Sequence, residues 1–327
     1  MNAELPLMRL KPPVLLRSPH LQTLLSSRLV SGFSNAGQTL LARAQTVVVP
    51  CRNGARLQAL ANLEFPGAPL VIVIHGWLGR ADSPYVCRTA DALHSAGFNV
   101  ARLQLRDHGG TAALNLELFN AARIDEVVDG CNYLVSRYGQ HGAGLMGFSL
   151  GGNFALRVAA HPDCDPGISA CFAVCPVVDP QTSADAIDSG WPAYRWYFVR
   201  KWREAFVEKQ AAFPDHYDFS ALAGMGRVAD LTDYLVERYT PYDNPDDYYS
   251  HYTLTADKLA GLKMNTLVLS AVDDPVIPVH TLGPLRTLPN GHFELSELGG
   301  HCAFIENYRL ESALDTYTVR YFRRLQF

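Results

Sequence analysis

The middle of the chain alternates short apolar runs with stretches whose apolar residues recur every three to four positions, which is typical of strands followed by helices. The run Leu70–Ile74 is continuously apolar, as expected of a strand that is buried on both faces. This alternation predicts an α/β fold with a mostly parallel central sheet and helices on both of its faces. The predicted strands are Thr46–Val49, Arg56–Glu64, Leu70–Ile74, Asn99–Leu105, Leu145–Phe148, Ser169–Val174, Thr266–Ala271 and Phe293–Leu298.

The segment from about Pro180 to Leu262 interrupts this alternation. It is too long for a loop in a compact domain, and it holds sixteen of the chain's aromatic residues, which are 4 Trp, 15 Tyr and 15 Phe. We predict a helical cap inserted between two strands, whose aromatic side chains either form its own core or line an apolar substrate pocket. The expected parts are an N-terminal helical segment (1–45), a core (46–179 and 263–327) and the cap (180–262).

Composition narrows the classes of function. The 327 residues carry a formal net charge of −4, and the sequence has no basic footprint for nucleic acid. Its apolar runs fall short of the roughly 18 residues of a membrane span, and the first residues lack the apolar core of a secretory signal. We therefore expect a cytoplasmic protein. Its oligomeric state is not indicated.

The seven cysteines are odd in number and include no CxxC pair. In a chain without a secretory signal, this spacing favours reduced and buried thiols over a disulfide framework. The same spacing argues against a structural zinc site. We therefore expect neither disulfides nor a metal.

A GxSxG sequence, Gly147-Phe-Ser-Leu-Gly151, marks a candidate nucleophile. It follows an apolar run and precedes the helical pattern Asn153–Ala160, which gives the strand, turn and helix that a nucleophile elbow requires. The glycines allow a tight turn that lifts the hydroxyl of Ser149 out of the sheet. Because a serine hydroxyl is a weak nucleophile that needs an adjacent base, an acid and a histidine should follow later in the chain.

His301 is the candidate base. It follows Gly299 and Gly300 after the last predicted strand, where a flexible loop can deliver an imidazole to the edge of the sheet. His292 is the competing candidate, but it precedes that strand and so belongs at the opposite end of the sheet.

The acid should stand at the end of the strand before the histidine, where Asp273 and Asp274 occur. We favour Asp274, because it directly precedes Pro275, where the chain must turn, and we expect Asp273 to cap that turn with its side chain. Asp179 is a more distant candidate, whose alternative role is that of a helix cap.

A tetrahedral intermediate needs hydrogen-bond donors for its oxyanion. One donor is expected from the backbone N–H of Leu150, directly after the nucleophile. The other is expected from the glycine-rich loop after the third predicted strand, where the N–H of Trp77 can face the serine. We expect the neighbouring His75 to be structural.

The run Trp196–Val207 places Trp196, Trp202 and Phe206 near one face of a predicted helix, which makes them candidate pocket residues. One interpretation is that this face simply packs on the core. The other is that it contacts an acyl chain or gives the protein peripheral contact with a membrane surface.

Six blocks occur in the order Ser18-Pro-His-Leu-Gln-Thr23, His75-Gly-Trp-Leu-Gly79, Arg106-Asp-His-Gly-Gly-Thr111, Gly147-Phe-Ser-Leu-Gly-Gly-Asn153, Asp273-Asp-Pro275 and Gly299-Gly-His301. Together they resemble the signature blocks of the YheT-like α/β-hydrolases, which are related to eukaryotic α/β-hydrolase domain-containing lipases and medium-chain ethanol acyltransferases. The resemblance runs from about residue 11 to 310. It implies the α/β-hydrolase fold, carboxylic-ester chemistry with the triad Ser149, Asp274 and His301, and no cofactor. It leaves the substrate open, because the family contains esterases, phospholipases and acyltransferases.

Three competing interpretations remain. The segment Gly142–Gly147 matches the GxGxxG of dinucleotide-binding enzymes, but that motif needs a strand before its first glycine, and here a helix precedes it. A non-catalytic binding protein on a hydrolase fold is a second, although suitable residue types occupy all three triad positions. The third is an acyltransferase, which would pass the acyl group from Ser149 to an alcohol.

Among these interpretations, we favour a serine esterase of the carboxylesterase or lipase type, acting on small-molecule or lipid esters with short to medium acyl chains.

Overall fold

The computed structural model describes residues 8, 10–28 and 35–324, and in this part of the chain eight strands form one sheet in the order β1-β2-β4-β3-β5-β6-β7-β8. β1 and β2 pair antiparallel, as do β2 and β4, and all other neighbours are parallel, with Ile72 of β3 opposite Ala101 of β4 and Leu145 of β5. The strands are β1 (Gln45–Pro50), β2 (Arg56–Asn62), β3 (Leu70–Ile74), β4 (Asn99–Gln104), β5 (Ala143–Phe148), β6 (Ile168–Val174), β7 (Asn265–Ala271) and β8 (Gly291–Ser296). The predicted α/β fold is confirmed, and every predicted strand overlaps an observed one.

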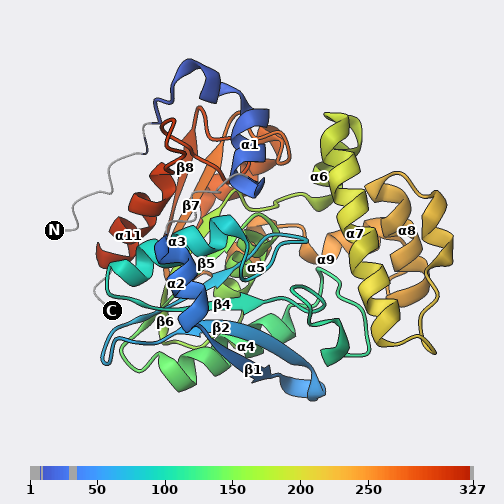
Figure 1. Cartoon of the computed structure of the whole chain (residues 1–327), viewed down its shortest axis with the longest axis horizontal. Coiled ribbons are helices and arrows are strands. Elements are labelled where there is room, and N and C mark those ends of the chain that lie inside the picture. Colours follow the sequence, from blue (N-terminus) through green and yellow to red (C-terminus); the bar gives the residue numbers. More distant parts are fainter. Residues whose placement is uncertain (1–7, 9, 29–34, 325–327) are drawn as a thin grey trace.

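Helices cover both faces of this sheet (Figure 1). One face carries α2 (Asn35–Arg43), α3 (Pro84–Ser95) and α11 (Ala313–Arg324). The other carries α4 (Asp125–Tyr138), α5 (Leu150–Ala160) and α10 (Ala256–Leu259). Before the first strand, the short 3-10 helix η1 (Val14–Arg17) leads into α1 (Pro19–Arg28).

The apolar run of β3 explains why two layers of helices are needed. Ile72 is buried in the same cluster as Leu134 of α4, whereas Val73 is buried in the cluster that contains Phe322 of α11. Alternate side chains of a strand point to opposite faces, and full burial of each one stabilises the fold by about 1.5–3 kcal/mol. A continuously apolar strand is therefore stable only between two helical layers.

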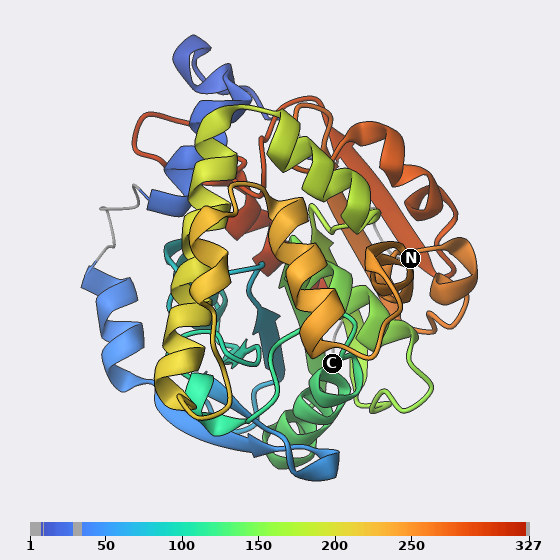
Figure 2. The ribbon, with the colours of Figure 1, turned by 90° about the vertical axis from the view of Figure 1, so that its right-hand side faces the viewer.

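Between β6 and β7 the chain leaves the sheet and forms a group that we call the insertion helices. Figure 2 shows them in front of the sheet. In the described part of the chain, no helix is long and apolar enough to cross a membrane. The insertion helices are α6 (Pro180–Ser189), α7 (Pro192–Ala212), α8 (Val228–Tyr239) and α9 (Pro245–Tyr252).

A buried lysine fastens α7 to the core. Lys209 has no exposed surface, and its ammonium group lies 2.8 Å from the Asp107 carboxylate. The same group donates to the carbonyl oxygens of Ala112, Asn115 and Glu117 at 3.2, 2.7 and 3.1 Å. A buried charge requires such full pairing, so the register of α7 on the loop after β4 is fixed.

Candidate active site

The turn that carries Ser149 joins β5 directly to α5. Its backbone is in the left-handed region, with φ 53° and ψ −118°, a strained conformation for a residue with a side chain. A Cβ on Gly147 would lie 2.0 Å from the carbonyl oxygen of Gly151, and a Cβ on Gly151 would lie 2.3 Å from that of His75. Both glycines of GxSxG are therefore required for this turn to close.

Ser149, His301 and Asp274 lie in one chain of hydrogen bonds, although they follow three different strands. The His301 Nε2 atom is 2.9 Å from the Ser149 hydroxyl oxygen, and its Nδ1 atom is 2.8 Å from Oδ2 of Asp274. A neutral imidazole that donates from Nδ1 can accept the serine proton at Nε2. This geometry is the one that nucleophilic catalysis by serine requires.

The Asp274 carboxylate also caps the turn that follows it. Its Oδ1 atom accepts hydrogen bonds from the backbone N–H groups of Val276 and Ile277 at 2.8 and 3.0 Å. The expectation that Asp273 would cap this turn was therefore wrong, because the two oxygens of one carboxylate serve the turn and the imidazole together. Asp273 instead accepts from the N–H of Gly300 at 2.9 Å, and its other oxygen is buried without a partner among the described residues.

The two competing candidates lie elsewhere. His292 is exposed near the start of β8, at the end of the strand opposite to His301. Asp179 caps α6, where its side chain accepts from the N–H of Thr182 at 3.0 Å. The GxGxxG segment 142–147 falls largely inside β5, after α4, and so lacks the preceding strand of a dinucleotide site.

The charge of Asp274 controls the basicity of His301. Burial lowers the pKa of His301, but the nearby Asp274 carboxylate and its hydrogen bond outweigh burial and raise the pKa to about 9. Since only the neutral imidazole can take a proton from Ser149, the fraction of competent base increases as the pH rises toward this value.

The expected oxyanion donors lie beside the nucleophile. Trp77 and Leu150 line the same cavity as Ser149, and within the described residues neither backbone N–H has a hydrogen-bond acceptor. The next residue, Leu78, has a left-handed φ of 56°, and its N–H donates to Nε2 of His108 at 3.1 Å. The turn that contains Trp77 is thus held by a side chain.

His108 was not predicted to have this role. It is buried, its Nδ1 atom donates to the carbonyl of Arg106 at 2.7 Å, and burial lowers its pKa to about 4. The ring therefore stays neutral and keeps its acceptor for Leu78. His75 is likewise buried with its pKa lowered to about 3, and its ring bonds to Gly76 and Leu105. In the sequence, the only sign that His108 matters was its place in the block Arg106–Thr111, which resembles a family signature.

The N-terminal helix α1 holds the loop that carries His301. The hydroxyl of Thr23 accepts from the N–H of His301 at 3.0 Å, and Gln22 bonds both to the N–H and to the carbonyl of Ile305. Gly300 has a left-handed φ of 52°, and a Cβ there would lie 2.8 Å from Gln22. The block Ser18–Thr23 therefore has a structural role, which is to hold the loop of His301, and the sequence alone did not reveal it.

A cavity of about 280 Å³ lies above the serine, between the core and the insertion helices. Two of the candidate pocket residues, Trp196 and Trp202, line it. Trp202 packs edge-on against Trp77, with ring centroids 4.8 Å apart. Other aromatic side chains in its wall are Tyr85, Phe119, Phe148, Tyr194, Tyr197, Phe198, Tyr248, Tyr249 and Tyr252.

Phe206 is not among the residues that line this cavity. It is buried one helical turn beyond Trp202, where its ring packs against Trp202 at 5.6 Å and against Phe219 at 4.7 Å. Helical spacing placed both residues on one face, but α7 lines the cavity only as far as Trp202. The aromatic residues of the insertion thus divide between a core of their own and the cavity wall.

Comparisons with known proteins bear on the fold. Residues 69–308 match the family model described as alpha/beta hydrolase fold. The comparison with curated proteins gives no match. Among solved structures, the Pyrococcus furiosus esterase Pf2001 is similar with a TM-score of 0.58 at 15% identity, over 98% of this chain and 98% of that one.

Two further structures share the fold. Est1E from Butyrivibrio proteoclasticus, solved with ferulic acid bound, has a TM-score of 0.56 at 17% identity, over 86% of this chain and 98% of that one. A serine hydrolase from the polyaromatic hydrocarbon-degrading bacterium Cycloclasticus zankles has a TM-score of 0.58 at 16% identity, with the same two coverages. At such identities, the likeness concerns the fold alone.

Proposed function

Since the chain belongs to the alpha/beta hydrolase fold family, we propose that it is a serine hydrolase that cleaves carboxylic esters through an acyl-enzyme on Ser149. The observation that carries the proposal is the pair of hydrogen bonds, 2.9 and 2.8 Å long, that links Ser149 to His301 and His301 to Asp274. His301 takes the proton of Ser149 as its oxygen attacks the ester carbonyl, and then gives that proton to the departing alcohol. Asp274 holds the tautomer and stabilises the imidazolium.

The oxyanion of the tetrahedral intermediate is bound by the backbone N–H groups of Trp77 and Leu150. Donors of this kind contribute on the order of 3–4 kcal/mol to lowering the barrier. Water then enters, loses a proton to His301 and attacks the acyl-enzyme, which releases the acid and restores Ser149. His108 acts through Leu78, because its neutral ring fixes the turn before this attack begins.

The size and lining of the cavity favour a short to medium acyl chain. An engineered cavity of about 150 Å³ holds the six carbons of benzene, so about 280 Å³ holds roughly eleven non-hydrogen atoms at the same density. This is the size of a small-molecule ester with an acyl chain of about six to eight carbons, or of one chain of a lipid ester. Within the hydrolases, we propose a YheT-like esterase.

We further propose that residues 180–262 act as a cap that selects this acyl chain. Trp191 and Trp196 lie at the start of α7 and are 43% and 57% exposed, and Trp196 also lines the cavity. The guanidinium of Arg200 lies 5.3 Å from the ring of Trp196. Exposed tryptophans beside arginine suit peripheral contact with a membrane surface. We propose a cytoplasmic location, where the seven free cysteines would stay reduced.

The experiment is a series of p-nitrophenyl esters from acetate to palmitate, with and without ethanol as a second acceptor. Each buried CH₂ contributes about 0.8 kcal/mol, so kcat/KM should rise about fourfold per CH₂ up to roughly octanoate and then fall. Hydrolysis predicts free acid as the main product in both conditions. A predominantly ethyl-ester product would make the protein an acyltransferase instead.

Trp202→Ala tests the role of the insertion in chain selection. It should flatten the increase with chain length and leave acetate hydrolysis within a few-fold. Phe206→Leu, one turn further along α7 and outside the cavity, is the matched control and should change thermal stability without changing the chain-length profile. If both variants kept the wild-type profile, the wall of the cavity would not select the acyl chain.

A further inference from the structure

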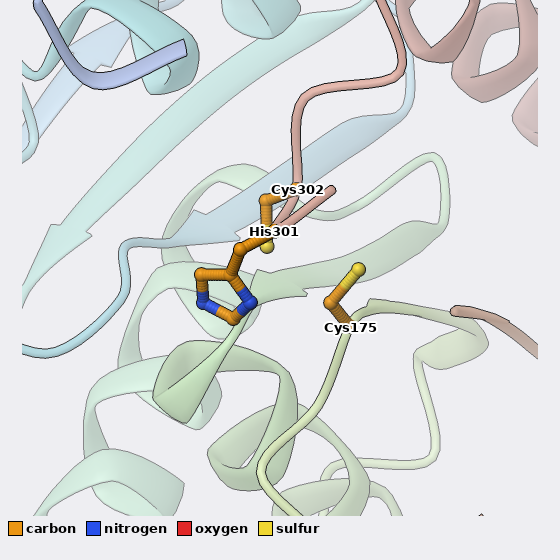
Figure 3. Close-up of side chains that lie close together, drawn as sticks. All are labelled: Cys175, His301 and Cys302. Carbon is orange, nitrogen blue, oxygen red and sulfur yellow. The ribbon is translucent and has the colours of Figure 1, made fainter. Parts of the chain in front are cut away.

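Two cysteines lie against the candidate catalytic histidine. Cys175 directly follows β6, and Cys302 directly follows His301 in the loop after β8. One ligand atom from each of Cys175, His301 and Cys302 lies within 4.8 Å of the other two. Figure 3 shows the two sulfur atoms and the imidazole ring around one small space. The three residues come from two distant segments, so spacing rules based on CxxC pairs could not have found them.

The backbone holds both cysteines in an unusual conformation. Cys175 has φ 43° and Cys302 has φ 63°, both in the left-handed region that residues with side chains rarely adopt. Their thiols contact each other, and they also make long contacts, from Cys302 to the Val174 carbonyl at 3.6 Å and from Cys175 to the Gly300 carbonyl at 4.0 Å. The two thiols are therefore buried beside each other and beside the imidazole.

We propose that Cys175, His301 and Cys302 form a binding site for a thiophilic divalent cation such as Zn²⁺, and that its occupation switches the hydrolase off. Two cysteines and one histidine, with a fourth position left to water, are a donor set that zinc takes in enzymes. With metal–sulfur and metal–nitrogen bonds of about 2.3 and 2.0 Å, the donors of a tetrahedral site lie about 3.3–3.8 Å apart. The ligand atoms, which lie within 4.8 Å of one another, need to approach by at most about 1.5 Å.

Charge and access also suit such an ion. Two thiolates and a neutral imidazole around Zn²⁺ make a complex without net charge, which limits the penalty for burial. Each thiol releases one proton to solvent as it binds the ion. His301 and Cys302 both line the substrate cavity, so an ion can arrive by the route of the substrate.

Inhibition follows from the position of His301, and this part of the proposal rests on the proposed function. One ring nitrogen of His301 is bonded to Asp274 and the other to Ser149. A cation that takes either nitrogen removes one of these two hydrogen bonds. The serine then has no competent base, whichever nitrogen is taken.

The test is a titration of the full-length enzyme with buffered Zn²⁺ under a non-chelating phosphine reductant, with p-nitrophenyl butyrate as substrate. Inhibition should be reversed by EDTA. Cys175→Ser and Cys302→Ser should each raise the half-inhibiting zinc concentration, relative to the variant's own zinc-free rate, by at least about tenfold. Cys164→Ser, which changes a thiol outside the cluster, should leave it unchanged. Inhibition that is equal in all four proteins would overturn the proposal.

A second measurement does not depend on catalysis. Ser149→Ala retains all three ligands, so calorimetric titration should show one equivalent of Zn²⁺ bound, and Co²⁺ should give a thiolate charge-transfer band that is lost with Cys302→Ser. An inactive wild-type enzyme that still binds one equivalent in this way would refute the proposed function and leave the site. An active enzyme that gives neither zinc binding nor this band would refute the site and leave the function.

Discussion

Replacing Asp274 by asparagine tests the chain of hydrogen bonds most finely, because the change is almost isosteric. The Oδ1 atom of Asp274 accepts two backbone N–H groups, those of Val276 and Ile277, and Oδ2 accepts the Nδ1–H of His301. An asparagine that keeps its oxygen on the two backbone groups must turn its NH₂ toward His301. Nδ1 then has to accept, the ring proton moves to Nε2, and Nε2 can no longer take the proton of Ser149.

The expected loss is therefore large. In the serine-protease template, the same wrong-tautomer effect lowers kcat by about ten-thousandfold, which corresponds to about 5 kcal/mol of transition-state stabilisation. Asp273→Asn is the matched control. Its oxygen can still accept the N–H of Gly300, and the amide replaces a carboxylate whose pKa is raised by burial, so kcat should stay within about threefold of wild type.

The pH profile gives an independent readout of the same change. In the wild type the pKa of His301 is raised to about 9, so kcat/KM should rise with pH across the range 7 to 9, as the protonated imidazole becomes neutral. Asp274→Asn removes the group that raises this pKa and leaves the burial that lowers it. The residual activity should therefore be flat over that range. Steady-state kinetics on p-nitrophenyl butyrate measure both effects, and equal, mild losses in the two variants would refute this role of Asp274.

The remaining predictions concern the scaffold of the site. Lys209→Met leaves the buried Asp107 carboxylate without its cation and should lower the free energy of unfolding by about 3–5 kcal/mol. Lys201→Met, at an exposed position, is the control. Equal denaturant midpoints for the two variants would contradict this role of Lys209. Gly151→Ala places a Cβ 2.3 Å from the carbonyl of His75 and should abolish soluble, active enzyme, whereas Gly224→Ala, which enters open space, should not. An active Gly151→Ala enzyme would show that the elbow tolerates a side chain.

The sequence predicted the framework well because its signals are local. The central strands β3, β5, β6 and β7 are mostly apolar runs of a few residues, and Leu70–Ile74 is apolar throughout because it is buried on both faces. The position of Ser149 likewise follows from two glycines within two residues of it. The order of serine, acid and histidine along the chain then limits where the other two can lie, since each should follow a strand of the same sheet.

What the sequence could not show are the contacts between distant segments. Thr23 holds the loop of His301 from 278 positions away, and Lys209 reaches Asp107 across 102 positions. Helical periodicity also could not separate Trp202, in the cavity wall, from Phe206, one turn further. Both are apolar on the same face, and only the packing of the insertion helices on the core decides which one meets the cavity.

The central claim is that Ser149 becomes covalently acylated, and intact-protein mass spectrometry with a fluorophosphonate probe tests it most directly. The wild type should gain one adduct, and peptide mapping should place it on Ser149. Ser149→Ala should remain unlabelled while it keeps its fold by circular dichroism, and it should lose nearly all esterase activity, by analogy with the roughly millionfold loss in a serine protease. An adduct on another residue, or a Ser149→Ala enzyme with a tenth or more of the wild-type rate, would contradict the account.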